Sequence, residues 1–298
     1  MNAPKMDSVS GADDPGRISA LLGRAIDDIG IPPCPEILVQ INAEMGKDEP
    51  DLKRLDAIVS SDAGLAAGLI ALANSPFFGI RNRVRSAREA LMMLGLAVAG
   101  RAIAGIVLRK MFPPTPALLR FWDSSARVAR VCSWLSQGGR IAPRLRPDEA
   151  YTFGLFRDCG IPVLLRRFEQ YENVVTQASG ESSLAFTAVE ESFCTTNHAA
   201  VGCLLAQAWW LPDDIALAIR HHHDYSLLDS QAVSPSATSR HLAAAALLAE
   251  HLVQTHTGAG LTQEWGKGAA IGLRLLGLDE ASVPALLDAS APVVHGET

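Results

Sequence analysis

The sequence predicts an all-α protein with about a dozen helices and no significant sheet. Apolar residues recur at intervals of three and four along most of its 298 residues. Capping residues precede many of these stretches, and glycine or proline follows them, as is usual at helix ends. No segment alternates apolar and polar residues for long enough to predict a β-strand, and no repeat of solenoid length is present.

The first half of the chain predicts clearly delimited helices. Asp51 and Asp62 stand where an N-cap carboxylate accepts hydrogen bonds from free backbone N–H groups. Ser86 and Glu89 form a capping box, and Gly95 ends the helix that it opens. The predicted helices cover residues 18–26, 36–45, 52–59, 63–73, 86–94, 96–111 and 118–137.

The second half predicts helices as well, with Asn197 as an N-cap and Pro212 in a first turn. The Ser-rich stretch 231–239 predicts a loop between a main body and a C-terminal extension. We expect a flexible tail over 1–17, one domain over 18–228, and a helical extension over 236–298 packed on it. The predicted helices cover residues 148–156, 162–177, 182–193, 197–210, 212–222, 241–256, 261–276 and 281–288.

Composition narrows the class of function. Apolar residues make up 48% and charged residues 19%, and the net charge is −6. This is a globular composition without the basic surface that direct nucleic-acid binding needs. No uncharged apolar stretch of about 18 residues is present, and the polar start lacks a secretory signal. We therefore expect a cytoplasmic protein without membrane segments, and its five scattered cysteines fit reduced, buried thiols.

The chemistry-bearing residues are few and dispersed. The chain has no Gly-x-Ser-x-Gly, no P-loop and no His-Glu-x-x-His motif. What remains is Asp158, His198 and the run 221–223, which reads His-His-His. A divalent ion needs about three such ligands converging from different helices. Adjacent helical residues diverge by about 100°, so His222 and His223 are not expected to bind the same ion, and a solvated histidine run is the simpler alternative.

Three segments give these residues a context. Residues 31–35 are Ile-Pro-Pro-Cys-Pro, residues 72–79 are Leu-Ala-Asn-Ser-Pro-Phe-Phe-Gly, and residues 90–95 are Ala-Leu-Met-Met-Leu-Gly. In this order and at this spacing they resemble the HDOD family, and the likeness extends over roughly residues 18 to 225. The resemblance implies an HD-like helical bundle, similar to HD metal-dependent phosphohydrolases but regulatory and non-catalytic, as found in bacterial signalling proteins.

The resemblance also implies a damaged metal-binding pattern. The leading histidine of the HD pattern falls near Ser124, and the histidine of the His-Asp pair is Arg157. The aspartate is kept as Asp158. The later histidine positions match His198 and His222, with His223 as a further candidate. The final acidic position falls near Glu250.

Charge explains what Arg157 does to such a site. A guanidinium cannot donate a lone pair to a metal, and it adds a permanent positive charge. At ~4 Å from a divalent ion, the repulsion is on the order of 8 kcal/mol at an effective dielectric constant of about 20. We therefore expect a vestigial pocket with no metal, no cofactor and no catalytic residue, in which Arg157 neutralises Asp158. Its residues are Ser124, Arg157, Asp158, His198, His222 and His223.

A second feature is the basic stretch of Arg81, Arg83, Arg85 and Arg88. Such a stretch is usually a solvated face, and the alternative is a patch for an anionic ligand or an acidic partner.

The leading hypothesis is a non-catalytic signal-transduction module that acts through other signalling proteins. Formation of a homodimer and binding of a small nucleotide-type ligand are both compatible with this hypothesis. The rival is a divergent phosphohydrolase that uses Asp158, His198 and His222 on a nucleotide or cyclic dinucleotide. A third alternative is a sensor that uses the pocket only to bind a small molecule.

Overall fold

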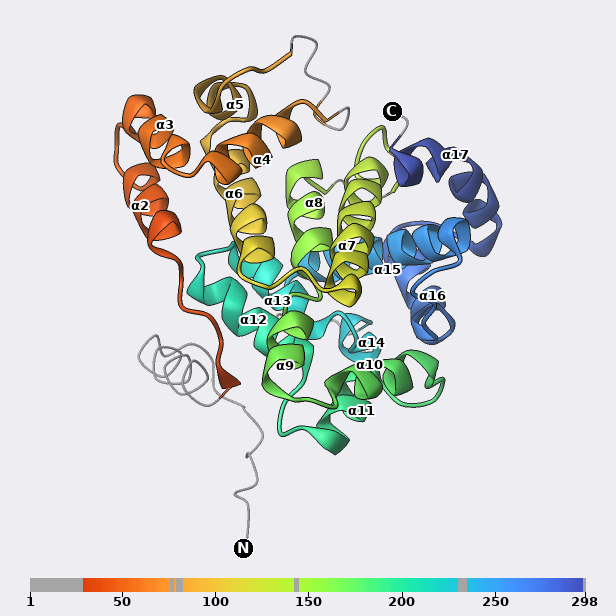
Figure 1. Ribbon diagram of the computed structural model, residues 1–298. Coiled ribbons are helices and arrows are strands. Elements are labelled where there is room, and N and C mark those ends of the chain that lie inside the picture. The colour runs from red at the N-terminus through yellow and green to blue at the C-terminus, as the bar shows by residue number, and fades with distance from the viewer. Residues whose placement is uncertain (1–28, 76–77, 79–82, 142–144, 230–234, 297–298) are drawn as a thin grey trace, which may run out of the picture.

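A computed structural model describes residues 29–75, 78, 83–141, 145–229 and 235–296, and every regular element in these ranges is a helix (Figure 1). The predicted all-α class is confirmed. The expected tail over 1–17, the helix over 18–26 and Arg81 lie outside the described residues.

The N-terminal helices form one group, coloured red to yellow in Figure 1. Asp51 accepts a hydrogen bond from the Lys53 backbone and Asp62 from that of Leu65, so both predicted N-caps are present. Gly95, at φ 76°, separates the last two helices. The group contains α2 (Glu36–Met45), α3 (Leu52–Ser60), α4 (Ala63–Ala73), α5 (Ala87–Leu94) and α6 (Leu96–Lys110).

Asn74 holds the end of α4 against the segment that leads into α5. Its side-chain amide donates to the carbonyls of Ile70, at 3.0 Å, and Val84, at 2.8 Å. Its carbonyl oxygen accepts from the Val84 N–H at 2.8 Å. The asparagine of the Leu-Ala-Asn-Ser motif therefore has a structural role, because it links the end of α4 to the segment before α5.

Three helices make the centre of the molecule: α7 (Pro116–Leu135), α8 (Pro147–Phe156) and α15 (Ala237–Thr257). Helix α7 packs against both of the others, and α6 joins the N-terminal group to α8. A Cβ on Gly154 would lie 2.8 Å from the Ala129 Cα, so α7 and α8 approach closely where that glycine lies. The functional residues begin at the C-terminal end of α8.

Shorter helices cover one end of this centre, in green to cyan in Figure 1. They are α9 (Gly160–Arg167), α10 (Tyr171–Gly180), α11 (Phe186–Phe193), α12 (His198–Ala208), α13 (Asp213–His221) and α14 (Tyr225–Leu228). The single helix predicted over 162–177 is wrong. Phe168 has extended backbone, at φ −124° and ψ 116°, and the chain turns there before α10 begins. The helix predicted from residue 182 begins only at Phe186.

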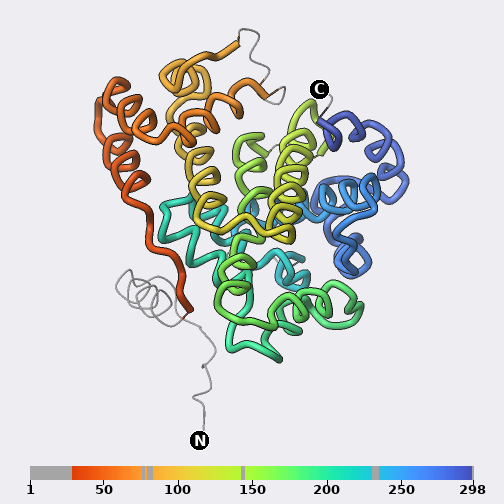
Figure 2. Tube along the Cα trace, viewed as in Figure 1, coloured from red at the N-terminus to blue at the C-terminus, as the bar shows by residue number. Residues whose placement is uncertain are grey.

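The C-terminal helices are part of the same body. They are α15, α16 (Glu264–Leu275) and α17 (Val283–His295), with a short 3-10 turn at Glu280–Ser282. Helix α15 packs on α7, α8 and α13, and α17, in dark blue in Figure 2, packs on α7. One continuous buried cluster includes residues from Ile31 to Val294. The helix predicted to end at residue 288 continues to His295. The boundary between domain and extension stays a prediction.

Among the described residues, no single helix has both the length and the apolar character needed to cross a bilayer. Helices α3 and α4 meet that test only when taken together across a 115° bend.

Candidate functional site

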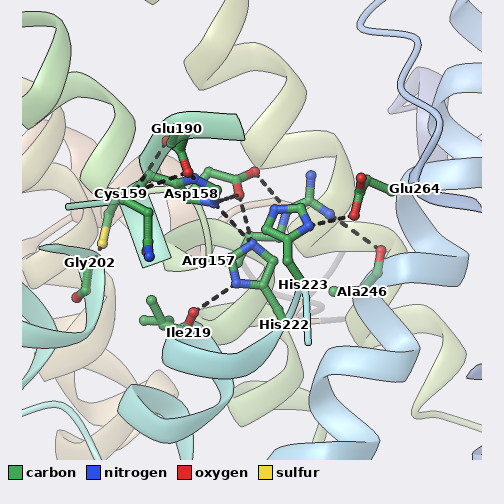
Figure 3. Close-up of polar contacts among 12 residues, drawn as sticks. Arg157, Asp158, Cys159, Glu190, Gly202, Ile219, His222, His223, Ala246 and Glu264 are labelled. Atoms are coloured by element: carbon green, nitrogen blue, oxygen red, sulfur yellow. Dashed lines mark hydrogen bonds and ion pairs between the residues drawn. The ribbon is translucent and has the colours of Figure 1, made fainter. Parts of the chain in front are cut away.

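Four side chains from three helix ends lie close together (Figure 3). Asp158 lies between α8 and α9, His198 begins α12, and His222 and His223 follow α13. One ligand-type atom from each of the four lies within 4.8 Å of the others. The convergence that the sequence left open is therefore present.

Glycine brings two of these helix ends together. A Cβ on Gly160 would lie 2.1 Å from the His198 carbonyl oxygen and 2.9 Å from the Gly202 nitrogen. The start of α9 therefore contacts the backbone of α12 directly. Asn197 caps α12 by accepting from the Ala200 N–H at 2.8 Å, as predicted. This contact places His198 next to Asp158.

The expectation that His222 and His223 diverge is wrong. Helix α13 ends at His221, His222 is its C-cap, and His223 lies in the turn beyond it. The helical separation of about 100° therefore does not apply to this pair. Their ring centroids lie 4.1 Å apart, and both side chains are buried.

Arg157 occupies one side of the site. Its Nε lies 2.8 Å from Asp158 Oδ2, and its Nη2 lies 2.8 Å from Glu250 Oε1. Its Nη1 donates to the Ala246 carbonyl at 3.4 Å, and the residue is only 7% exposed. The expected ion pair with Asp158 is present, and Glu250 is close to the site as the resemblance implied.

The ion pairs outweigh burial for two of these groups. Burial alone would lower the pKa of Arg157, but Asp158 and Glu250 raise it, so the guanidinium stays charged. Burial would raise the pKa of Asp158, but Arg157 and the neighbouring imidazoles hold it well below its usual value. Burial dominates at Glu250 and raises its pKa.

Histidines occupy the other side. Asp158 Oδ1 lies 3.3 Å from His222 Nε2 and 3.6 Å from His198 Nε2. The two Nε2 atoms are 3.3 Å apart. His223 stacks on Phe186, with ring centroids 5.0 Å apart and planes inclined by 13°. One carboxylate therefore divides its two oxygens between a guanidinium and a set of imidazoles.

An outer layer of acceptors holds each imidazole. His198 Nδ1 lies 2.7 Å from Glu190 Oε2, and His222 Nδ1 lies 2.7 Å from the Ile219 carbonyl. His223 Nδ1 lies 2.6 Å from Glu264 Oε2. Tyr171 and Tyr225 donate to the same two glutamates.

The pKa values of His198 and His223 shift in opposite directions. Burial lowers the pKa of His198, but the charge of Glu190 and its hydrogen bond raise it by more, so the net shift is upward. Burial, followed by the charge of His222, lowers the pKa of His223 to about 4. Burial opposes ionisation of Glu264, but its bonds to His223, Lys267 and Tyr225 lower the pKa to about 2.

Sequence reasoning missed Glu190 and Glu264, both almost fully buried. One feature of the sequence could have identified Glu190. It lies on the same face of α11 as the apolar residues Phe186 and Val189, where a charged residue is unusual. For Glu264 no local signal distinguishes it from a helix-start acid.

The cluster lines a cavity of about 660 Å³. Ser124 lies at this cavity and is exposed, so all six predicted pocket residues border one space. The apolar wall comes from several helices and includes Phe121, Ile161, Leu165, Val175, Phe186 and Val253. Arg83, Arg85 and Arg88 are exposed and do not line it, so the basic stretch is a separate feature.

A family model for the HDOD domain matches residues 31–225. The chain belongs to the HDOD domain family. The match begins later and ends slightly earlier than the 18–228 expected from the sequence.

Two solved structures share the fold at low identity, and one further protein is similar in sequence. A protein of Shewanella amazonensis SB2B, named as a candidate phosphohydrolase, is 18% identical with a TM-score of 0.67, covering 93% of this chain and 96% of its own. One of Marinobacter aquaeolei VT8, named as a candidate signal transduction protein, is 21% identical with a TM-score of 0.65. The match covers 94% of this chain and 63% of that protein's chain. An uncharacterized Treponema pallidum (strain Nichols) protein is 23% identical over 209 residues, covering 70% of this chain. The chain spans 40% of that relative's length.

The donor set of this HDOD site fits one metal ion on its histidine side. Neutral imidazoles and a carboxylate are common ligands of zinc and related ions. The opposite side does not fit a second ion, because Arg157 is bound there to both Asp158 and Glu250.

Proposed function

We propose that this HDOD protein is a non-catalytic regulatory module of bacterial signalling, acting in the cytoplasm through a protein partner. The observation that carries the proposal is the buried guanidinium of Arg157 between Asp158 and Glu250. The guanidinium forms ion pairs with two carboxylates, Asp158 and Glu250, that a hydrolytic metal centre would need as ligands.

The same observation argues against phosphoester hydrolysis by paired metals. In such enzymes two ions about 3.5–4 Å apart stabilise the attacking and the leaving oxygen. Here Ser124 offers no imidazole, and Arg157 holds the oxygen of Asp158 that a second ion would use. A phosphate ester bound here would lack the second ion that activates water, and Arg157 already donates to Asp158, Ala246 and Glu250.

The cavity supports a role for a small ligand. Its walls come from α7, α10 and α15 and from the segment that leads to α16. Gln254 Nε2 donates to the Gly260 carbonyl at 2.7 Å, and the Gln263 N–H donates to the Ser179 carbonyl at 3.0 Å. A ligand in the cavity would touch both α10 and the segment that leads to α16. If it moved α16, it would change the surface that the protein presents to a partner.

The test of the regulatory proposal is a hydrolysis assay on the full chain. Generic phosphodiesters and cyclic dinucleotides are incubated with the protein and with added manganese, magnesium or iron(II). We expect no turnover above the protein-free blank. Hydrolysis that is present in the wild type and lost in Asp158→Ala would overturn the proposal.

A second candidate is the divergent phosphohydrolase acting on a nucleotide or cyclic dinucleotide. The observation that favours it is the retained group of Asp158, His198, His222 and His223. The name of the Shewanella amazonensis neighbour points the same way. The hydrolysis assay decides between the two candidates, because only this one predicts turnover.

A thermal-shift screen tests the ligand. A compound that binds only the native state adds about 2.7 kcal/mol of stability at a concentration 100 times its Kd. We expect a nucleotide-type compound to raise the Tm of the wild type by several degrees and that of Phe186→Ala by less. A screen in which no nucleotide shifts the Tm would favour a pure protein adaptor.

A further inference from the structure

We propose that the outward face of α5 and the segment leading into it form a docking surface for a short acidic, amphipathic helix of a partner protein. The surface consists of Arg83, Arg85, Arg88, Met92 and Met93, all of them exposed. The proposal rests on the proposed function, since a module that acts through a protein partner needs a surface where that partner docks. Helix α5 lies at the top of Figure 1, whereas α10 and α11, which border the 660 Å³ cavity, lie at the bottom.

The backbone that carries the arginines is held in place. The N–H and the carbonyl of Val84 are both bonded to the Asn74 side chain, each at 2.8 Å, and the Val84 side chain is buried. Arg83 and Arg85, on either side of it, are exposed. The Arg85 N–H also donates to Glu89 Oε2 at 2.7 Å, in the first turn of α5. A partner that binds these arginines therefore needs to order little backbone, which favours affinity.

The charges of the three arginines are not neutralised within the described part of the chain. No carboxylate there pairs with the guanidinium of Arg83, Arg85 or Arg88. All three lie before or within the first turn of α5, where the helix dipole is already positive. Helix stability alone favours acids at that end, and Glu89 is the single acid in the turn. The placement therefore favours an anionic partner.

An apolar pair follows the arginines on the same helix. Met92 is 52% exposed and Met93 is 55% exposed, and no other large apolar side chains exposed in the described residues are neighbours in sequence. Arg88 and Met92 are four residues apart, so they are adjacent on one face of α5. Methionine adapts to different apolar partners and is common at binding surfaces. The buried face of α5 is formed by Ala87, Ala90, Leu91 and Leu94.

This combination fits a protein helix better than a lipid surface or nucleic acid. Anionic membranes attract clusters of about 4–8 basic residues, and nucleic acid needs a broad basic footprint. The docking surface has three arginines, on a chain of net charge −6. A helix lying along α5 would place acids beside the arginines and apolar residues on the methionines. Such recognition of an amphipathic helix is common, and opposite charges at its edge fix the register.

The experiment measures binding of a designed peptide to the full chain by fluorescence anisotropy. The labelled probe has about 18 residues, enough to form a helix, with leucine at intervals of three and four and glutamate or glutamine elsewhere. A second peptide has the same composition in an order that gives no apolar face. We expect the amphipathic peptide to bind at least about tenfold more tightly. Its affinity should fall between about 0.1 M and about 1 M salt, because the Debye length shrinks from about 10 Å to about 3 Å.

Charge reversal shows where the peptide binds. Arg88→Glu should weaken binding at least about fivefold, the upper value for one exposed ion pair. Arg83→Glu/Arg85→Glu/Arg88→Glu should weaken it by about 100-fold if the three effects add. Arg109→Glu is the matched control, because Arg109 is also an exposed helical arginine but lies near the far end of α6. It should leave the affinity within about twofold of the wild type.

A second pair of variants tests the apolar half. Met92→Ser/Met93→Ser should weaken binding of the amphipathic peptide at least about tenfold, because the peptide no longer buries these side chains. Leu261→Ser is the control, since Leu261 is 67% exposed and lies outside the docking surface. All the substituted side chains are exposed, so the variants should fold, and circular dichroism and the Tm check each one.

Three results would overturn the inference: no binding of the amphipathic peptide, equal binding of both peptides, or binding that charge reversal leaves unchanged. Tighter binding of phosphatidylglycerol vesicles or duplex DNA would assign the surface to lipid or nucleic acid instead. Self-association that is lost in the triple variant would assign it to a second copy of the chain. The hydrolysis assay tests the regulatory proposal separately, because Asp158→Ala leaves α5 untouched and the arginine variants leave the cavity untouched.

Discussion

The two oxygens of Asp158 face opposite kinds of surroundings. Oδ2 meets Arg157, a cation that belongs to the chain, and Glu250 shares that cation. Oδ1 faces the Nε2 atoms of His198 and His222, which change from acceptors to donors when the rings are protonated. The arginine side holds a permanent cation, whereas the charge on the histidine side depends on the protonation of the imidazoles.

This difference depends on one residue, because Arg157 supplies a permanent cation to one side of the site only. The carboxylates behind His198 and His223 remain buried and bonded as metal-supporting groups would be. Four variants test this contrast.

The largest effect is expected on the arginine side. Arg157→Ala leaves Asp158 and Glu250 facing each other without a cation, in a place where water has little access. Removing one partner of a buried ion pair costs about 3–5 kcal/mol. Urea unfolding should show a loss of this size. Glu250→Gln, which keeps an acceptor for the guanidinium, should cost clearly less, and equal losses would contradict the buried-pair account.

The next variant forces the start of α9 away from α12. Gly160→Ala places a Cβ at 2.1 Å from the His198 carbonyl oxygen, which is backbone and cannot move aside cheaply. We expect the free energy of unfolding to fall by about 3 kcal/mol, the upper range for overpacking.

Gly266→Ala is the control for this variant, because a Cβ there meets nothing within 4 Å on α16. It should stabilise the protein by about 0.5–1 kcal/mol, since alanine favours helix over glycine. Similar destabilisation by both substitutions would show that the Gly160 contact is not what matters.

A smaller effect is expected behind the histidines. Glu190→Gln removes the charge that receives bonds from His198 and Tyr171. Hydrogen bonds to charged groups contribute about 1.5–3 kcal/mol, so we expect a loss of about 2 kcal/mol. Tyr171→Phe, which removes one neutral donor, should cost about 1 kcal/mol. A larger loss in Tyr171→Phe than in Glu190→Gln would mean that the tyrosine, not the imidazole, needs the carboxylate.

The smallest effect calibrates the others. Arg274 and Asp229 form an ion pair in which both side chains are more than half exposed. Water screens such pairs, so Arg274→Ala should change stability by less than about 0.5 kcal/mol. A loss that approaches that of Arg157→Ala would remove burial as the reason for the contrast.

Much of the helical framework could be predicted from local patterns. The N-caps Asp51, Asp62 and Asn197 act through neighbours two or three residues away, so their signal is contained in a short stretch of sequence. Where the prediction failed, as at Phe168, an apolar period continued across a break that packing imposes.

The candidate site divides in the same way. Arg157 and Asp158 are adjacent in sequence, so their pairing was foreseeable. His223 was judged unable to join His222 because the end of α13 was placed one residue too late. Glu190 and Glu264 were missed because a buried glutamate looks like any helical glutamate until its partner is known.

The sequence by itself determined the helical class, the family resemblance and the cation at residue 157, because these depend on residue types and on local periods. Only the tertiary structure decided which oxygen the Nδ1 atom of each imidazole faces. That choice depends on acceptors supplied by α11, α13 and α16, which lie up to 41 residues away along the chain. A hydrogen bond between distant segments leaves no periodic trace in sequence, yet here such bonds hold His198 and His222 with their Nε2 atoms 3.6 and 3.3 Å from one carboxylate oxygen of Asp158.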